Sequence, residues 1–347
     1  RSHLFRQHGS IGCRVAATDH GNDKQWNAND YGLTPRLTVP DNERWTPRIS
    51  VSRTDVDIAI KGNGDAVAST ALVVEALKPV ASVRLRVSPF ANITDVRWIS
   101  DLPVNVDNVN QVELLSPYKE DENATPDEPL SINGESLYYI QDTHERRMED
   151  DLHEPWVTAF LPRPMARGDR FIITIAYRGK LIERQRGNRG YLLKDSIYWI
   201  PRHIDNRKRR LRLTFRVPES LRIASGGTLA SEIVDDGTRI MRWISPTPIR
   251  GTMAFQLGRF EIDEIAPDGL PPIAIYADRN HLGFAPGARD RTIKDLIGSM
   301  RTYVDYFGPY PFKSLLVTET QEFGGRAFPG LVLLTFQAFG ELHTGEA

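Results

Sequence analysis

The stretch YFGPYPFKSLLVTETQEFGGRAFPGLVLL, residues 306–334, decides which fold this chain can adopt. It places a Pro-rich segment, an apolar run, a Gly-Gly pair and a second apolar run one after another. Proline fixes the backbone dihedral φ, and glycine lets another backbone approach closely. The pattern predicts two strands, at 314–318 and 331–334, joined by an irregular glycine-rich loop.

A helix is predicted immediately before this stretch. Apolar residues recur there at helical spacing, and Gly308-Pro309 supplies the stop signal. The apolar positions are Ile293, Leu296, Ile297, Met300, Tyr303, Val304 and Phe307. Because the chain before this helix reads as strands, we expect a separate domain to begin at about residue 273 and to include residues 273–347.

The region 48–265 is rich in short runs that alternate apolar and polar side chains. Alternation with a period of two predicts half-buried strands, and frequent Gly and Pro between them indicate antiparallel pairing. The predicted fold is mainly β, with an antiparallel saddle-like or sandwich-like N-terminal domain followed by an α+β segment. Residues 1–47 show neither period, so we expect a polar extension or linker. The clearest alternating runs are 56–60, 83–87, 171–177 and 211–215.

Composition limits the classes of partner. The chain has 44 Lys and Arg against 45 Asp and Glu, so its net charge of −1 gives no global field that would attract nucleic acid or an anionic membrane. We therefore predict a small-molecule or protein partner and no nucleic acid. The single cysteine, Cys13, cannot form an internal disulfide. Because the chain begins at Arg1 and not at a methionine, we expect it to be a fragment of a longer protein. The sequence gives no prediction of the cellular compartment.

The order of motifs resembles the aminopeptidase N family of zinc peptidases. The resemblance runs from about residue 48 to residue 347, and it is strongest after Tyr198. It implies a β-domain joined to a thermolysin-like catalytic domain, zinc as cofactor, and hydrolysis of peptide bonds. The matching residues are Trp199 with Pro201, Val217-Pro218, Gly226-Gly227, Trp243, Gly258 to Glu261, 306–312 and 323–331.

The resemblance also implies a role for the glycine-rich loop. In the family this segment is an edge strand beside the zinc, where its backbone pairs with an extended peptide and a glutamate binds the α-amine of the substrate. The implied substrate-binding residues here are Gly324, Gly325, Arg326, Ala327 and Phe328. Arg326 stands at the family's methionine position, Ala327 at its glutamate and Phe328 at its asparagine. Without that carboxylate we expect weak activity on short peptides with a free amine, and either a preference for other peptide ends or interiors, or lost catalysis.

The sequence contains no His-Glu-x-x-His motif, which a zinc peptidase of this kind needs. The nearest string begins at His144, but Met148 stands where the second histidine is required, and His153-Glu154 lacks the spacing. The resemblance implies that the zinc helix follows the glycine-rich strand. We therefore expect the zinc ligands beyond residue 347, with no catalytic residue or metal ligand in this chain, which alone should be inactive.

Two other hypotheses stay open. The chain could belong to a non-catalytic relative that serves as a protein-binding or scaffolding module after loss of its zinc site. It could also be a plain β-sandwich interaction domain whose likeness to the family is only architectural. A plain sandwich has no reason to carry the helix and the glycine-rich strand, so the fold separates this last hypothesis from the others.

Overall fold

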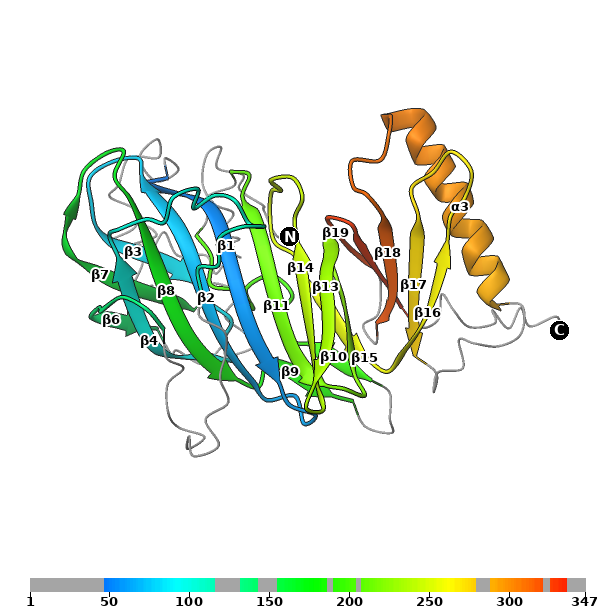
Figure 1. Cartoon of the computed structure of the whole chain (residues 1–347), viewed down its shortest axis with the longest axis horizontal. Coiled ribbons are helices and arrows are strands. Elements are labelled where there is room, and N and C mark those ends of the chain that lie inside the picture. Colours follow the sequence, from blue (N-terminus) through cyan, green and yellow to red (C-terminus); the bar gives the residue numbers. More distant parts are fainter. Residues whose placement is uncertain are drawn as a thin grey trace, which may run out of the picture.

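The structure is a computed structural model in which the chain is mainly β, with one long helix among the described residues (Figure 1). Predictions for 1–46, His144, His153-Glu154 and Gly324 lie outside the described residues. The described residues are 47–115, 132–142, 155–185, 190–203, 207–278, 288–320 and 325–335.

The largest layer is an eight-stranded sheet in the order β13-β14-β11-β1-β2-β8-β4-β5. All neighbours pair antiparallel except β1 and β11, which are parallel. The prediction of an antiparallel β-domain is confirmed. The strands are β1 (Ile49–Ile60), β2 (Ala66–Ala76), β4 (Ala91–Ile99), β5 (Glu135–Ser136), β8 (Arg170–Gly179), β11 (Arg210–Pro218), β13 (Thr228–Asp235) and β14 (Thr238–Ile244).

Smaller sheets share one core with the large sheet. Trp199 is fully buried in this core, and its indole nitrogen donates a hydrogen bond to the carbonyl oxygen of Met253 at 2.9 Å. The ring centroids of Phe215 and Phe255 lie 4.8 Å apart beside it. The smaller sheets consist of β3 (Val80–Arg86), β7 (Trp156–Met165) and β6 (Tyr139–Gln141); β9 (Ile182–Arg184) and β10 (Tyr191–Leu193); and β12 (Arg222–Ser225) and β15 (Phe255–Gly258).

The prediction of half-buried strands is wrong for the centre of the large sheet. Nearly all residues of β1, β2 and β8 are buried, on both faces, because the segment 101–115 covers the outer face. Arg53, which is fully buried, attaches this segment by donating hydrogen bonds to the carbonyl oxygens of Val106 at 2.6 Å, Asn108 at 3.1 Å and Val112 at 2.5 Å. Because residues 101–115 have no apolar periodicity, the sequence does not indicate that they cover the outer face of the sheet.

The C-terminal part is a five-stranded sheet in the order β16-β17-β18-β20-β19, with α3 (Ala288–Phe307) between β17 and β18 in the chain. The predicted helix and strands are confirmed. Gly308, with φ of 85°, ends the helix, and its N–H donates to the carbonyl oxygen of Val304 at 2.9 Å. The strands are β16 (Phe260–Ile265), β17 (Ile273–Asp278), β18 (Leu315–Thr320), β19 (Arg326–Phe328) and β20 (Leu331–Thr335).

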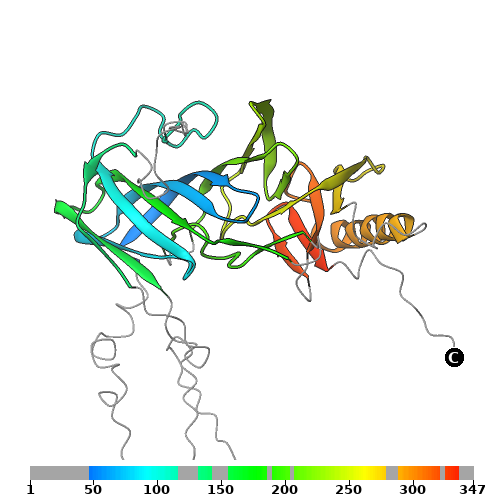
Figure 2. The ribbon, with the colours of Figure 1, turned by 90° about the horizontal axis from the view of Figure 1, so that it is seen from below.

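The two faces of this sheet pack against different layers. Met300 of α3 packs on the face that carries Ile275 and Val317, whereas Leu316 and Leu331 of the other face belong to the core of the β-domain. Figure 2 shows α3 at the end of the molecule opposite the three-stranded sheet. One face of the five-stranded sheet thus packs directly into the core of the β-domain. The predicted domain boundary between residues 265 and 273 stays a prediction. No helix of the described residues is long and apolar enough to cross a membrane.

Candidate functional site

The described part of the predicted substrate segment forms β19, the edge strand of the five-stranded sheet. β19 pairs antiparallel with β20, Ala327 opposite Val332 and Phe328 opposite Leu331. No strand of the described residues pairs with its other side. The turn between the two strands is Pro329-Gly330, in which proline fixes a negative φ and Gly330 has φ of 75°. This is the combination that a type II turn requires.

The turn determines which main-chain groups face the open edge. In an antiparallel pair joined by a two-residue turn, the residues that flank the turn are hydrogen-bonded to each other, and the next pair is not. Phe328 and Leu331 flank the turn, so we expect the N–H and C=O of Ala327 to point away from β20. An extended segment placed along this edge would find one donor and one acceptor there.

The side chains of β19 alternate between two environments. Arg326 donates a hydrogen bond from Nη1 to Oγ of Ser196 in the β-domain, at 2.5 Å. Phe328 packs against the core of the β-domain. Ala327 lies on the opposite face with its neighbour Val332, and it is exposed. The guanidinium that replaces the family's methionine is therefore held by the β-domain.

A pair of glycines from the β-domain contacts the turn of the hairpin. The N–H of Gly227 donates to the carbonyl oxygen of Pro329 at 3.2 Å. A Cβ atom on Gly226 would lie 2.8 Å from that same oxygen, closer than a side chain can come without movement. Two of the motifs that carry the family resemblance, Gly226-Gly227 and the segment with Pro329-Gly330, thus meet in one contact. The contact positions β19 against the β-domain.

The described residues do not fit a zinc ion. They contain no group of three or more His, Cys, Asp or Glu side chains placed to hold a metal. A catalytic zinc site needs three protein ligands with one open position.

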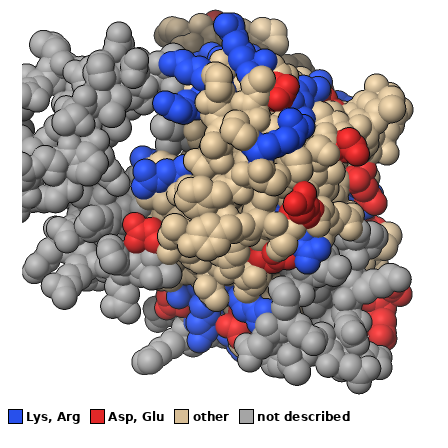
Figure 3. All heavy atoms as spheres, turned by 90° about the vertical axis from the view of Figure 1, so that its left-hand side faces the viewer, with Lys and Arg blue, Asp and Glu red and all other residues tan. Residues whose placement is uncertain are grey.

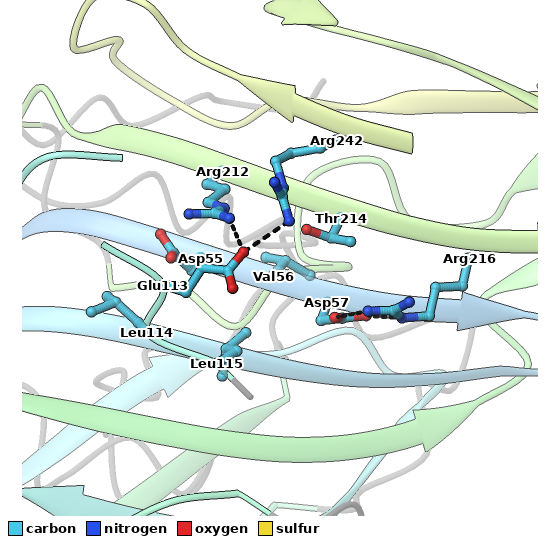
Figure 4. A pocket seen from close by; sticks show the side chains of 10 residues that line it. All are labelled: Asp55, Val56, Asp57, Glu113, Leu114, Leu115, Arg212, Thr214, Arg216 and Arg242. Carbon is cyan, nitrogen blue, oxygen red and sulfur yellow. Dashed lines mark hydrogen bonds and ion pairs between the residues drawn. The ribbon is translucent and has the colours of Figure 1, made fainter. Parts of the chain in front are cut away.

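A small polar pocket on the large sheet is a second candidate site (Figure 4). It lies between β1, β11 and residues 113–115 and encloses about 40 Å³, enough for one or two water molecules. Glu113 accepts hydrogen bonds from Arg212 and, at 2.8 Å, from Arg242. Asp57 accepts two hydrogen bonds from Arg216, at 3.0 Å and 2.9 Å.

The charges in this pocket balance each other. Three guanidinium groups and three carboxylates line it, which are Arg212, Arg216, Arg242, Asp55, Asp57 and Glu113. Burial raises the pKa of the Asp55 carboxyl, and a hydrogen bond from Arg53 opposes that shift. Burial also lowers the pKa of Arg212, with the nearby charge of Arg242 adding to the effect. The network attaches residues 113–115 to the sheet, and its size and neutrality favour that structural role.

Sequence reasoning found the edge strand but not the contacts that hold it. Arg326 and Ser196 are 130 residues apart, and neither stands in a motif that predicts their hydrogen bond. The alternating side chains of β11 predicted which of them share a face of the strand. They did not indicate that residues 113–115 cover one of these faces.

The same arrangement of sheets occurs in solved structures of M1 zinc metallopeptidases. One from Deinococcus radiodurans is 14% identical, with a TM-score of 0.56 over 85% of this chain and 62% of that chain. A mutant from the same organism, bound to a Tyr-Ser-Ala substrate, has a TM-score of 0.57 at 14% identity over 84% and 61%. A two-domain M1 mutant bound to L-arginine has a TM-score of 0.56 at 14% identity over 83% and 61%.

This likeness shows the fold, and it confirms the predicted resemblance to the aminopeptidase N family at that level. The chain spans about 61% of the length of the solved structures it matches. No protein-family profile matches the sequence, and no curated protein matches it.

Proposed function

We propose that this chain forms the β-domain and the first part of the catalytic domain of a zinc-dependent peptidase, and that β19 aligns an extended peptide. The observation that carries the proposal is that the outer edge of β19 pairs with no strand of the described residues, and we expect the main-chain groups of Ala327 to face that edge. The solved structures that share the fold are zinc metallopeptidases, one of them bound to a Tyr-Ser-Ala substrate. The zinc ligands would then lie outside residues 1–347, and this chain alone would be inactive.

Backbone pairing explains how β19 would bind peptides of varied sequence. A peptide that adds a strand to a sheet edge gains main-chain hydrogen bonds whatever its side chains are. The hydrogen bonds from Arg326 to Ser196 and from Gly227 to Pro329 fix the edge before any peptide arrives. A fixed edge lowers the entropy that binding must overcome.

The side chains of β19 disfavour a free α-amine. Ala327 offers neither charge nor acceptor where the family has a glutamate. The neighbouring Arg326 supplies no carboxylate in its place, because its side chain is positively charged and is held by Ser196 on the opposite face of the strand. We therefore propose that the preferred peptide has a blocked end or is bound through an interior segment.

A non-catalytic binding module is the second candidate function. The exposed alanine at position 327 favours it, because loss of the amine-binding carboxylate is a change that a former peptidase could tolerate. The plain β-sandwich hypothesis is wrong, since α3 and the five-stranded sheet extend the fold beyond a sandwich.

The test begins with peptide binding by this chain. An N-acetylated peptide rich in β-branched residues should shift the ¹⁵N–¹H signal of Ala327, and Ala327→Pro should weaken binding because proline removes that N–H. Arg163→Gln, on the distant strand β7, is the control. The intact protein is then assayed for bound zinc and for hydrolysis of the same peptide. Binding without zinc or hydrolysis would favour the module, and no binding at the edge would contradict the proposal.

A further inference from the structure

The outer edge of β13, at one end of the large sheet, is a surface on which another strand could add. β13 pairs with β14 on one side and with no strand of the described residues on the other (Figure 1). Ile233 and Val234, near its end, are 57% and 47% exposed. A Cβ atom on Gly237, in the turn that follows, would meet no atom within 4 Å. Figure 2 shows this yellow-green hairpin projecting at the top of the view.

The turn after β13 determines which main-chain groups face the outer edge. Asp236 and Gly237 have φ of 42° and 71°, and positive φ at both central positions characterises a type I′ turn. Asp235 precedes this turn and pairs with β14 across it. Residues that flank a two-residue turn are hydrogen-bonded to each other, and the main-chain groups of every second residue then point away from the partner strand. We therefore expect the N–H and C=O of Glu232 and Val234 to face outward.

The other edge strands of the described residues are protected against pairing with another chain. Short length and charged side chains are the usual means of protection. The edge strands β5, β6 and β19 have two or three residues. The edge strand β16 has three acidic residues in FEIDEI, and β3 has two arginines in VASVRLR. The sheet that contains β3 lies at the end of the molecule shown in Figure 3, where Lys and Arg gather on the upper left.

The charged side chain in the middle of the β13 edge is balanced within its own chain. Glu232 accepts a hydrogen bond from Arg239 and lies 3.8 Å from a nitrogen atom of Arg222. A bulge at Ala230 interrupts the pairing with β14, so the regular edge consists of residues 231–235. This edge thus combines outward main-chain groups with exposed apolar side chains and lacks a repelling charge at its centre.

The sequence of β13 allows the strand to pair with a second copy of itself. Two antiparallel copies can match their outward groups in three registers. Glu232 opposite Glu232 brings two carboxylates together, and Val234 opposite Val234 places Glu232 against Asp236. Like charges directly opposite each other destabilise a strand pair. The third register, Glu232 opposite Val234, has no such pair and places Ile233 opposite Ile233 on the twofold axis.

We propose that β13 is a dimer interface, through which two copies of this chain pair antiparallel with Glu232 of one opposite Val234 of the other. A twofold contact of this kind uses the same surface on both copies. A single strand pair buries less than the roughly 1,000 Å² of a stable interface, so the dimer forms weakly and in proportion to concentration. The inference is independent of the proposed function of β19.

Sedimentation velocity of this chain tests the dimer. Between about 1 and 200 µM the dimer fraction should rise with concentration. Ile233→Lys should weaken the dimer at least about tenfold, because it removes the apolar contact and places two lysines opposite each other. The matched control is Ile140→Lys, since Ile140 is 51% exposed on the edge strand β6, and it should leave the dimer unchanged. Circular dichroism checks that both variants are folded.

Disulfide trapping tests the register without relying on a disruptive substitution. In a Cys13→Ser background, Ile233→Cys should cross-link two copies on treatment with diamide, because directly opposite Cβ atoms lie about 4.5 Å apart. Ser231→Cys should not cross-link, since an offset of four residues separates its two copies by about 13 Å. A chain that stays monomeric over the whole concentration range would overturn the proposal. So would an equal effect of Ile140→Lys, or equal cross-linking at both cysteine positions.

Discussion

Replacing Gly226 with alanine tests whether the β-domain positions the edge strand. The added Cβ atom would lie 2.8 Å from the carbonyl oxygen of Pro329 and 3.3 Å from Cγ of Met253. The nearer atom belongs to the backbone of the β19–β20 turn, so the turn has to move. Movement of the turn would lengthen or break the 3.2 Å hydrogen bond from Gly227 to Pro329.

The expected loss of stability follows from these contacts. Overpacking of a well-packed site lowers the free energy of unfolding by about 1–3 kcal/mol. Loss of an intramolecular hydrogen bond lowers it by about 1 kcal/mol. We expect Gly226→Ala to lower the free energy of unfolding by about 2 kcal/mol. Gly62→Ala is the matched control, because a Cβ there meets no atom within 4 Å. Its free energy of unfolding should stay within about 0.5 kcal/mol of the parent value.

Urea unfolding measures the free energies, and hydrogen exchange shows where the structure loosens. Gly226→Ala should speed exchange most in residues 325–335, while β1 and β2 keep their protection. An unchanged unfolding midpoint would show that the turn adapts without cost. Faster exchange spread evenly over both sheets would show that the contact does not act on β19 in particular. Either result would refute the positioning role.

Four further predictions follow from the structure. Burial raises the pKa of Tyr276 to about 12, above the value of about 10 in an unfolded chain. The unfolded state therefore loses its proton first, and the free energy of unfolding should fall by about 1.4 kcal/mol by pH 11. Urea unfolding at pH 9 and 11 should show a smaller fall in Tyr276→Phe. Metal analysis after dialysis against a weak chelator should find no stoichiometric zinc in this chain, and one tight zinc per chain would contradict the proposal. Hydrogen exchange should be faster in residues 293–307 than in the β-domain core, since Tyr303 and Phe307 are 60% and 82% exposed. In the intact protein, Ala327→Glu should raise the preference for a free-amine reporter over its N-acetylated form by about tenfold or more, because a charge-assisted hydrogen bond contributes about 1.5–3 kcal/mol. Strong activity of the parent protein that requires the free amine would show that another residue binds it.

The strands and the helix could be predicted because each carries its own periodic signal. Phe171, Ile173 and Ile175 alternate along β8, and the stripe from Ile293 to Met300 follows the helical period. The segment that covers the second face of β8, residues 101–115, could not be predicted, because it has no apolar periodicity. Arg53 shows the same limit, since an arginine in a strand is expected at a surface. Its burial is explained by its ion pair with Asp55 together with its three carbonyl partners, and the carbonyl partners come from the aperiodic segment.

The edge strand could be predicted from the sequence for a different reason. The backbone geometry at its turn restricts which residue types can stand there. Gly330, with φ of 75°, is an example, because glycine adopts a positive φ without strain. The direction in which the Arg326 side chain points could not be predicted from the sequence in this way. It depends on Ser196, which lies in the turn after β10, far away in the sequence.

The contacts of β19 also explain why a strand at the edge of one sheet depends on another part of the chain. Three described residues are too few to hold an edge strand in one place by pairing with β20 alone. The hydrogen bond to Ser196, the glycine contact at Gly226-Gly227 and the packing of Phe328 all involve the β-domain. Ala327, whose side chain lies on the opposite face from Phe328, is exposed. Contacts from outside the five-stranded sheet therefore help to fix β19, whose outer edge is not paired with any strand of the described residues.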